Sequence, residues 1–129
     1  MGSTHRWYTL PINESEKFEK FLRKTYPEAK NCNGYSCHKR NIISPAVLKR
    51  NGFHPQMIIQ RPGDVVITFP NGYHAGFNLG FNWAIARNIG TPEWIRFGNK
   101  AAKCDCGLVV FLHSLFILAF GKVLNTSKV

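Results

Sequence analysis

The sequence predicts one small domain that is mainly β, with helices flanking the strands. Short apolar stretches at Met57–Gln60 and Val65–Phe69 are separated by the turn sequence Arg61-Pro62-Gly63-Asp64, which is typical of neighbouring strands. The stretch 73–88 mixes glycine, asparagine and aromatic residues, which suits the bent strands of a small barrel. A length of 129 residues with 44% hydrophobic content allows one modest core and excludes a disordered chain.

A helix is expected before these strands, over Asn13–Thr25. Asn13 and Glu16 form a capping-box pattern at its start, and Pro27 stops it. Between these signals, Phe18 and two further apolar residues recur at helical spacing, so one face of the helix would pack on the core.

Two shorter helices are also expected. Ser44-Pro45 opens one that ends at Gly52, with serine at the N-cap, proline at the first helical position and glycine just past the end. Thr91-Pro92-Glu93 opens the other. Leu108–Phe120 is mostly apolar but too short to span a bilayer, which needs about 20 residues. We interpret it as a buried terminal element.

The chain carries a net charge of +10, from 17 Lys and Arg against 7 Asp and Glu. This surplus favours an anionic partner such as nucleic acid, an acidic protein or a small carboxylate, although a solvated basic surface is the simpler interpretation. The first residues lack the apolar run of a secretory signal, so the four cysteines indicate metal binding rather than disulfides.

The spacing of cysteine and histidine predicts a zinc site, because zinc takes four sulfur or nitrogen ligands in a tetrahedron. Two sets fit: Cys32, Cys37, Cys104 and Cys106, or the same set with His38 in place of Cys37. Since Cys37 and His38 are adjacent, spacing does not separate these alternatives. Buried free cysteines beside a surface histidine are a third interpretation, but a Cys-x-Cys pair is otherwise uncommon.

His74 is the candidate ligand of a second metal. It follows the predicted strand Val65–Phe69 and precedes Ala75-Gly76, small residues that allow a bound group to approach closely. A non-haem Fe(II) site uses two histidines and one carboxylate. Two of these ligands usually form a His-x-Asp or His-x-Glu pair, and none of the five histidines begins one. A structural histidine is therefore the competing interpretation.

Specific motifs occur at 38–45, 60–70 and 80–82, in Gly72-Tyr73-His74-Ala75-Gly76-Phe77-Asn78, and in Cys104-Asp105-Cys106. Together these motifs resemble the Jumonji-C histone lysine demethylases, above all the subfamily that acts on lysines nine and thirty-six of a histone tail. The resemblance implies a partial double-stranded β-helix of the jelly-roll or cupin type, as the C-terminal half of a catalytic domain. Residues 1–106 would form this partial domain with its zinc site, and 107–129 a divergent apolar tail.

The resemblance also implies a role for each matching residue. His74 would be the catalytic iron ligand, Trp7 and Lys39 would border the 2-oxoglutarate pocket, and Asn88 would lie near the methyl-lysine substrate. The implied zinc ligands are Cys32, His38, Cys104 and Cys106. This set leaves Cys37 free.

The chain departs from the family pattern at several positions. The family's His-x-Glu iron pair is expected upstream of the first residue, so two iron ligands would be absent. The family's lysine for the 2-oxoglutarate carboxylate falls at His5, with Arg6 next to it. Ala86 and Arg87 replace small hydroxyl residues of the methyl-lysine pocket. These departures suggest an N-terminally truncated catalytic domain or a degenerate paralogue.

The implied function is demethylation of trimethyl-lysine in histone tails by an Fe(II)- and 2-oxoglutarate-dependent dioxygenase with a zinc site. The expected location is the nucleus, with no membrane association and with nucleosomal DNA as a second partner of the basic surface. We expect no turnover by this chain alone, because two iron ligands are missing. The alternative function is a non-catalytic, zinc-stabilised remnant that binds chromatin or an acidic partner.

Overall fold

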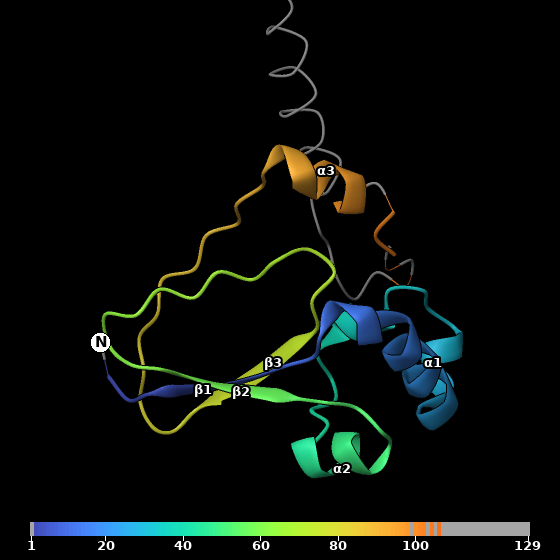
Figure 1. Cartoon of the computed structure of the whole chain (residues 1–129), viewed down its shortest axis with the longest axis horizontal. Coiled ribbons are helices and arrows are strands. Elements are labelled where there is room, and N and C mark those ends of the chain that lie inside the picture. Colours follow the sequence, from blue (N-terminus) through green and yellow to red (C-terminus); the bar gives the residue numbers. More distant parts are fainter. Residues whose placement is uncertain (1, 99, 103, 105, 107–129) are drawn as a thin grey trace, which may run out of the picture.

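A three-stranded antiparallel sheet forms the centre of the protein in the computed structural model, which describes residues 2–98, 100–102, 104 and 106 (Figure 1). The predicted terminal element, Leu108–Phe120, lies outside the described residues. The strand order is β2-β1-β3, with β1 (His5–Thr9) between β2 (Gln56–Gln60) and β3 (His74–Asn78).

The strand prediction is confirmed at Met57–Gln60 and wrong at Val65–Phe69. The latter segment has the alternating pattern of a strand but pairs with nothing in the described chain, so it stays irregular. Within 73–88, regular strand structure is limited to β3, followed by an isolated bridge between Gly2 and Asn82.

The first predicted helix is present as α1 (Ser15–Thr25), which follows a single 3-10 turn at Ile12–Glu14. The predicted capping box is wrong, because Glu14 occupies the N-cap position and no side chain caps the helix. The Glu14 carboxylate instead accepts hydrogen bonds from His54 at backbone N (3.1 Å) and at Nδ1 (2.6 Å).

The two shorter helices are confirmed. In α2 (Pro45–Arg50), the Ser44 hydroxyl accepts a hydrogen bond from the backbone N–H of Val47 at 3.3 Å. Gly52 follows this helix with φ +74°, a left-handed conformation that glycine adopts without steric cost. The second of these helices, α3 (Pro92–Gly98), begins at Pro92 as its sequence predicts.

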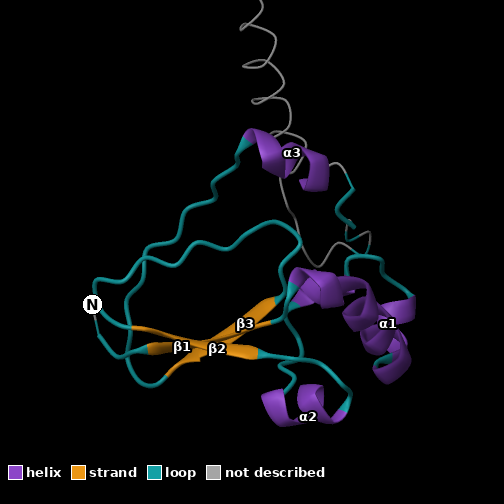
Figure 2. Ribbon diagram, viewed as in Figure 1, coloured by secondary structure: helices purple, strands orange, loops and turns teal. Residues whose placement is uncertain are grey.

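Helices α1 and α2 pack beside the sheet, as the ribbon diagram shows (Figure 2). One small core lies between them and contains three buried residues, Leu10, Leu48 and Phe53. Aromatic side chains surround this core and include Phe18, whose ring meets the Phe53 ring edge-on at 5.9 Å. None of the helices in the described part of the chain has the length and apolarity that crossing a membrane requires.

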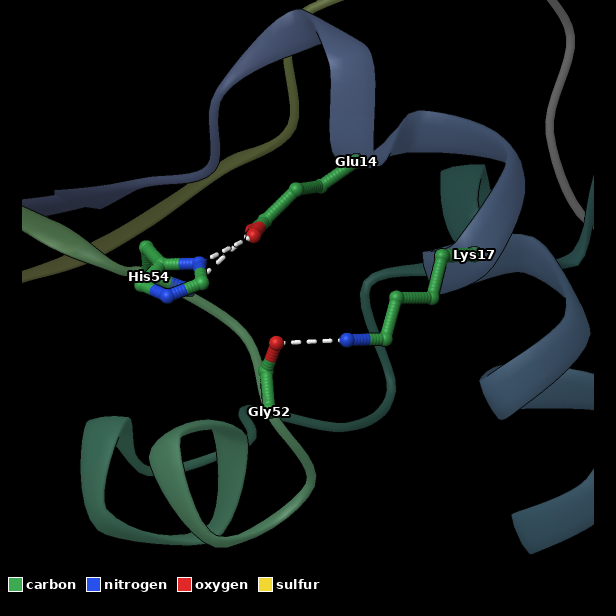
Figure 3. A network of polar contacts seen from close by, with 4 residues as sticks. All are labelled: Glu14, Lys17, Gly52 and His54. Atoms are coloured by element: carbon green, nitrogen blue, oxygen red, sulfur yellow. Dashed lines mark hydrogen bonds and ion pairs between the residues drawn. The ribbon is translucent and has the colours of Figure 1, made fainter.

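Polar contacts join the start of α1 to the connection between α2 and β2 (Figure 3). Beside the Glu14–His54 pair, Lys17 Nζ donates a hydrogen bond to the carbonyl of Gly52 at 2.5 Å and lies 4.5 Å from the Phe53 ring centroid. These contacts hold the connection against α1, so α1, α2 and the sheet share the core around Phe53.

Candidate metal and cosubstrate sites

Three thiols and one imidazole meet at the end of the molecule where α1 is followed by two short 3-10 turns. Cys32 follows the turn Pro27–Lys30, and His38 ends the turn Tyr35–His38. Cys104 and Cys106 come from the other end of the described chain. The potential ligand atoms of these four residues all lie within 4.8 Å of one another.

The distances between these atoms suit a tetrahedral metal ion. His38 Nε2 lies 3.4 Å from Cys32 Sγ, 3.1 Å from Cys104 Sγ and 3.2 Å from Cys106 Sγ. The Cys106 and Cys32 sulfurs are 3.9 Å apart. Zinc bonds of ~2.3 Å to sulfur and ~2.0 Å to nitrogen place neighbouring ligand atoms roughly 3.5–3.8 Å apart. The distances from His38 are a few tenths of an ångström shorter than these values, so the residues present fit a zinc ion if the ligands separate slightly.

These four residues, the Cys32 cluster, are anchored in a small core, and their surroundings favour the thiolate form of Cys104. Cys32 is 5% exposed and packs with Ala29 and Tyr35, while Cys104 lies against the same residues. The Cys106 thiol hydrogen-bonds to Cys104 at 3.0 Å, and this contact, assisted by His38, lowers the pKa of Cys104 to about 6. A lowered thiol pKa favours the metal-binding form.

Cys37 is exposed and is not a member of this group. Of the two ligand sets that spacing left open, the structure brings together the one that contains His38. The His38 ring also contacts Tyr35, with 5.2 Å between ring centroids, which orients the imidazole toward the three sulfurs.

His74 begins β3, where it is paired with Thr9 of β1. Because side chains alternate between the faces of a sheet, His74 shares one face with Trp7 and His5. The Trp7 ring centroid lies 5.7 Å from that of His74 and 4.2 Å from that of His5. Trp7 Nε1 donates a hydrogen bond to Gln60 Oε1 at 2.9 Å, which fixes the indole across the sheet.

The same alternation separates His5 from Arg6. His5 lies on the face that carries Trp7 and His74, and its Nδ1 is 2.5 Å from Asn78 Oδ1. Arg6 belongs to the opposite face. Of the two residues that could replace the family's lysine, only His5 is therefore on the side of the sheet where His74 lies.

Lys39, which directly follows the 3-10 turn Tyr35–His38, lies near His74. It has a left-handed backbone, with φ 53°. An open pocket of about 110 Å³ is lined by Lys39, His74, Thr9 and Tyr73, among other residues. Burial, together with a hydrogen bond to the Glu19 carboxylate, raises the pKa of Tyr73, so this phenol stays neutral.

Asn88 is not brought to this pocket. It is exposed, in the irregular segment between β3 and α3, and is absent from the pocket lining. Its predicted place beside a methyl-lysine substrate therefore finds no geometric support within the described residues.

His74 alone does not fit an iron site. It is exposed, and its Nδ1 lies 3.4 Å from the carbonyl of Gly72. Among the described residues, the only group of three or more Cys, His, Asp or Glu side chains with metal-binding spacing is the Cys32 cluster. An iron ion at His74 would need ligands from elsewhere.

The sheet face that carries His74 has two further polar residues that the sequence did not identify as parts of a site. They are Gln60 and Asn78, the hydrogen-bond partners of Trp7 and His5. The period-2 pattern could have identified Asn78, because His74, Gly76 and Asn78 alternate along one strand. Gln60 could not have been identified in this way, since its position opposite His5 depends on the register between distant strands.

Comparison with known proteins defines the class of this chain. The family described as "JmjC domain, hydroxylase" matches residues 1–89. The chain belongs to the JmjC domain family, and the predicted class of fold, a cupin-like sheet with flanking helices, is confirmed.

Individual relatives are lysine demethylases by name. The chain is 43% identical over 107 residues to "Probable lysine-specific demethylase 4F" of Homo sapiens, covering 82% of this chain and 17% of that protein. It is 42% identical to "Lysine-specific demethylase 4D" of Rattus norvegicus, with coverage of 82% and 21%. It is 39% identical to "Lysine-specific demethylase 4B" of Mus musculus, with coverage of 81% and 10%. The chain therefore spans about a fifth or less of the length of these relatives.

Proposed function

We propose that this chain supplies the C-terminal half of the catalytic domain of an Fe(II)- and 2-oxoglutarate-dependent histone lysine demethylase. The observation that supports this most directly is the shared sheet face of Trp7 and His74, in a chain 39–43% identical to lysine-specific demethylases. On this proposal, residues 1–106 are the partial domain, 107–129 are a divergent tail, and the protein acts on chromatin in the nucleus.

The proposed roles on the sheet follow from position. His74 would donate one imidazole nitrogen to iron, and Trp7 would hold that ring through their mutual contact. Lys39, across the shared pocket, would place a positive charge near a carboxylate of 2-oxoglutarate. Since the two remaining iron ligands are not among the described residues, a polypeptide carrying His-x-Glu would have to complete the centre, in the same chain or in another. Asn88 remains a substrate-binding candidate on resemblance alone.

The proposed role of zinc is structural. Cys32 and His38 come from the early part of the chain, whereas Cys104 and Cys106 come from its late part, so one ion would tie the two together. This set of four protein ligands leaves no open position for a reacting molecule, which distinguishes it from a catalytic zinc site.

The test is a pair of measurements on two preparations. The purified chain should contain about one equivalent of zinc, no stoichiometric iron, and release no formaldehyde from a trimethyl-lysine histone peptide supplied with Fe(II) and 2-oxoglutarate. Co-expression with the His-x-Glu-bearing segment of a JmjC relative should restore iron and formaldehyde release, and His74→Ala should abolish both. Robust release by the chain alone would contradict the proposed roles.

A second candidate function is favoured by the charge of +10. In this second function, a non-catalytic, zinc-stabilised remnant would bind nucleosomal DNA. The positive charge favours DNA over a histone tail as the partner, because the tail is itself basic. The discriminating result is a complemented complex that binds iron but releases no formaldehyde, together with DNA binding that weakens steeply as salt is raised.

A further inference from the structure

The chain contains three Asn-Gly pairs, Asn33-Gly34, Asn51-Gly52 and Asn71-Gly72. All three asparagines are exposed to solvent. Asparagine followed by glycine is the pair most prone to deamidation, because glycine has no side chain to shield its backbone nitrogen. The three pairs share this intrinsic reactivity and their access to water, so any difference in rate must come from the contacts that hold the backbone around each pair.

Deamidation at such a pair needs only water. The backbone nitrogen of glycine loses its proton and attacks the side-chain amide carbon of asparagine, and ammonia leaves as a succinimide ring closes. Water then adds to one of the two ring carbonyls. The ring opens to aspartate or to isoaspartate, in which the main chain runs through the former side chain. The glycine nitrogen must therefore be free to leave its hydrogen bond and turn toward the side chain.

Asn51-Gly52 is held at both reacting groups. The Asn51 side-chain amide donates a hydrogen bond to the carbonyl of Val47 at 2.9 Å. The Gly52 backbone N–H donates to the carbonyl of Lys49 at 3.0 Å, and the Gly52 carbonyl accepts from Lys17 Nζ at 2.5 Å. Attack of this nitrogen on this side chain would break all three contacts.

Asn33-Gly34 is held on one side of the reacting bond. Gly34 is buried, and its carbonyl accepts a hydrogen bond from the backbone N–H of Cys37 at 2.9 Å. The backbone N–H of Tyr35 donates to the carbonyl of Cys32 at 3.2 Å, which closes a turn around the pair. Burial shields the Gly34 nitrogen from the water that must take its proton, so this pair is also protected.

Asn71-Gly72 has the weakest restraint of the three. Within the described part of the chain, the Asn71 side-chain amide has no hydrogen-bond partner. The Gly72 N–H donates to the carbonyl of Phe69 at 3.4 Å, which is long for such a bond. Asn71 also has a left-handed backbone, with φ 59°, a conformation that costs energy for a residue with a side chain. The strongest contact of this turn is the hydrogen bond from Ser15 Oγ to the Asn71 carbonyl, at 2.8 Å.

We propose that Asn71-Gly72 is a site of spontaneous deamidation that alters both the charge and the main chain where the connection before β3 meets the start of α1. The proposal rests on this turn and not on the proposed function, because the reaction uses no residue of the candidate iron site.

The position of Asn71 gives the modification a structural consequence. Asn71 lines an open cavity of about 890 Å³ together with Glu16 and Glu19 of α1, so a carboxylate at 71 would add a third negative charge there. Like charges brought together in this way repel one another. Isoaspartate would in addition lengthen the main chain three residues before His74, at the entry to β3. Both products should therefore loosen the packing of β3 against α1.

The first test compares the three pairs in one sample. The purified full chain is incubated at mildly alkaline pH, and each pair is followed by peptide mapping with mass spectrometry, with a methyltransferase specific for isoaspartate as the probe. Asn71 should deamidate about tenfold or more faster than Asn51, because each hydrogen bond that must break raises the barrier. In concentrated urea the three rates should converge. Equal rates in the folded chain, or a faster reaction at Asn51, would overturn the proposal.

The second test changes the turn itself. Gly72→Ala should slow the reaction at Asn71 about tenfold by shielding the attacking nitrogen. Ser15→Ala should accelerate it severalfold by releasing the Asn71 carbonyl, while the rate at Asn51 stays unchanged. Circular dichroism checks that both variants keep the fold. A rate at Asn71 that neither substitution moves would contradict the assigned restraints and the proposed site.

The third test concerns the consequence. Incubation should lower the unfolding temperature of the unsubstituted chain. It should not lower that of Asn71→Gly, which tolerates the left-handed backbone but has no amide to lose. The same loss in both proteins would show that deamidation at Asn71 does not affect the junction between β3 and α1, and would overturn that part of the proposal.

Discussion

Cys32 and Cys37 show that residue type alone does not decide which side chain binds a metal. Both are cysteines in the same short connection, but Cys32 is 5% exposed within a small core and Cys37 is exposed to solvent. The adjacent His38, at the end of a 3-10 turn, takes the place that Cys37 could have had.

This difference leads to a prediction for two matched substitutions. Cys32→Ser should lose the zinc ion and much of the fold, because the free energy of binding a structural metal contributes directly to folding. Cys37→Ser should change stability by no more than ~0.5 kcal/mol, as is usual for surface substitutions. Zinc content by mass spectrometry and thermal unfolding measure both effects. Equal losses in the two variants would contradict the ligand assignment.

Glu14 is a buried carboxylate that holds the connection after α2. Its two hydrogen bonds from His54 lower the pKa of Glu14 below its usual value of 4.5. A carboxyl group with a lowered pKa stabilises the folded state above the unfolded-state pKa, and this contribution is lost as the pH falls through the folded-state value.

We therefore expect part of the stability to disappear below about pH 4.5, the unfolded-state value for Glu14. Glu14→Gln should lower stability at neutral pH and flatten the loss of stability in acid. Urea unfolding between pH 3 and pH 7 measures both changes. Glu16→Gln, at an exposed position two residues later, is the matched control and should leave the profile unchanged. The same profile for both variants would show that the Glu14–His54 pair does not couple to folding.

At the scale of the elements, β1 organises the sheet although nothing in its sequence indicated a strand. His5–Thr9 is short and contains mostly polar and aromatic residues, and all five residues are only partly buried. It becomes the central strand because β2 and β3 pair with its two edges from distant parts of the chain.

The close approach of β3 to β1 gives a prediction for Gly76. A Cβ at this position would clash with His5 Nε2 and would lie 2.6 Å from the carbonyl oxygen of Arg6. Gly76→Ala should therefore force the strands apart and destabilise the protein by about 1–3 kcal/mol, as overpacking usually does. Gly80→Ala is the control, since its Cβ would meet only the Ser3 side chain, at 3.2 Å. Denaturant unfolding compares the two, and equal stabilities would mean that β3 packs less closely on β1 than described.

At the scale of the whole molecule, stability is expected to depend on the closure of a long loop. The described residues form two small cores, one around Phe53 and one around Cys32, and of these two the second contains potential metal ligands. A metal bound to Cys32 and Cys104 would close a loop that contains both outer strands of the sheet, β2 and β3.

Removal of metal should therefore affect the entire fold rather than one end of it. Adding a strong chelator to the purified chain should lower the unfolding temperature by ~10 °C or more, because a loss of 1 kcal/mol alone shifts a small domain by roughly 4–8 °C. Returning zinc should restore the transition, while magnesium should not, since it prefers oxygen ligands. Tryptophan fluorescence and circular dichroism follow the change, and insensitivity to chelation would exclude a structural metal.

Capping residues near the helix ends were sufficient to predict the short helices from the sequence. For α2, the start is marked by Ser44 and Pro45 and the end by Gly52. These residues lie at or next to the helix, so no distant contact was needed to predict it. The family motifs likewise indicated the JmjC class, because those residue types recur at characteristic spacings. The candidate residues of the Cys32 cluster could be named in advance for the same reason.

Tertiary structure alone decided which local patterns were realised. Val65–Phe69 has the alternation of a strand but no partner in the described chain, whereas His5–Thr9 lacks that signal and is paired on both edges. The meeting of His38 with the three sulfurs, and the placement of His5 and not Arg6 on the face that carries His74, also depended on contacts between distant segments. Strand pairing and metal clustering are non-local, so their free energy depends on which segments meet, and residue spacing does not specify that.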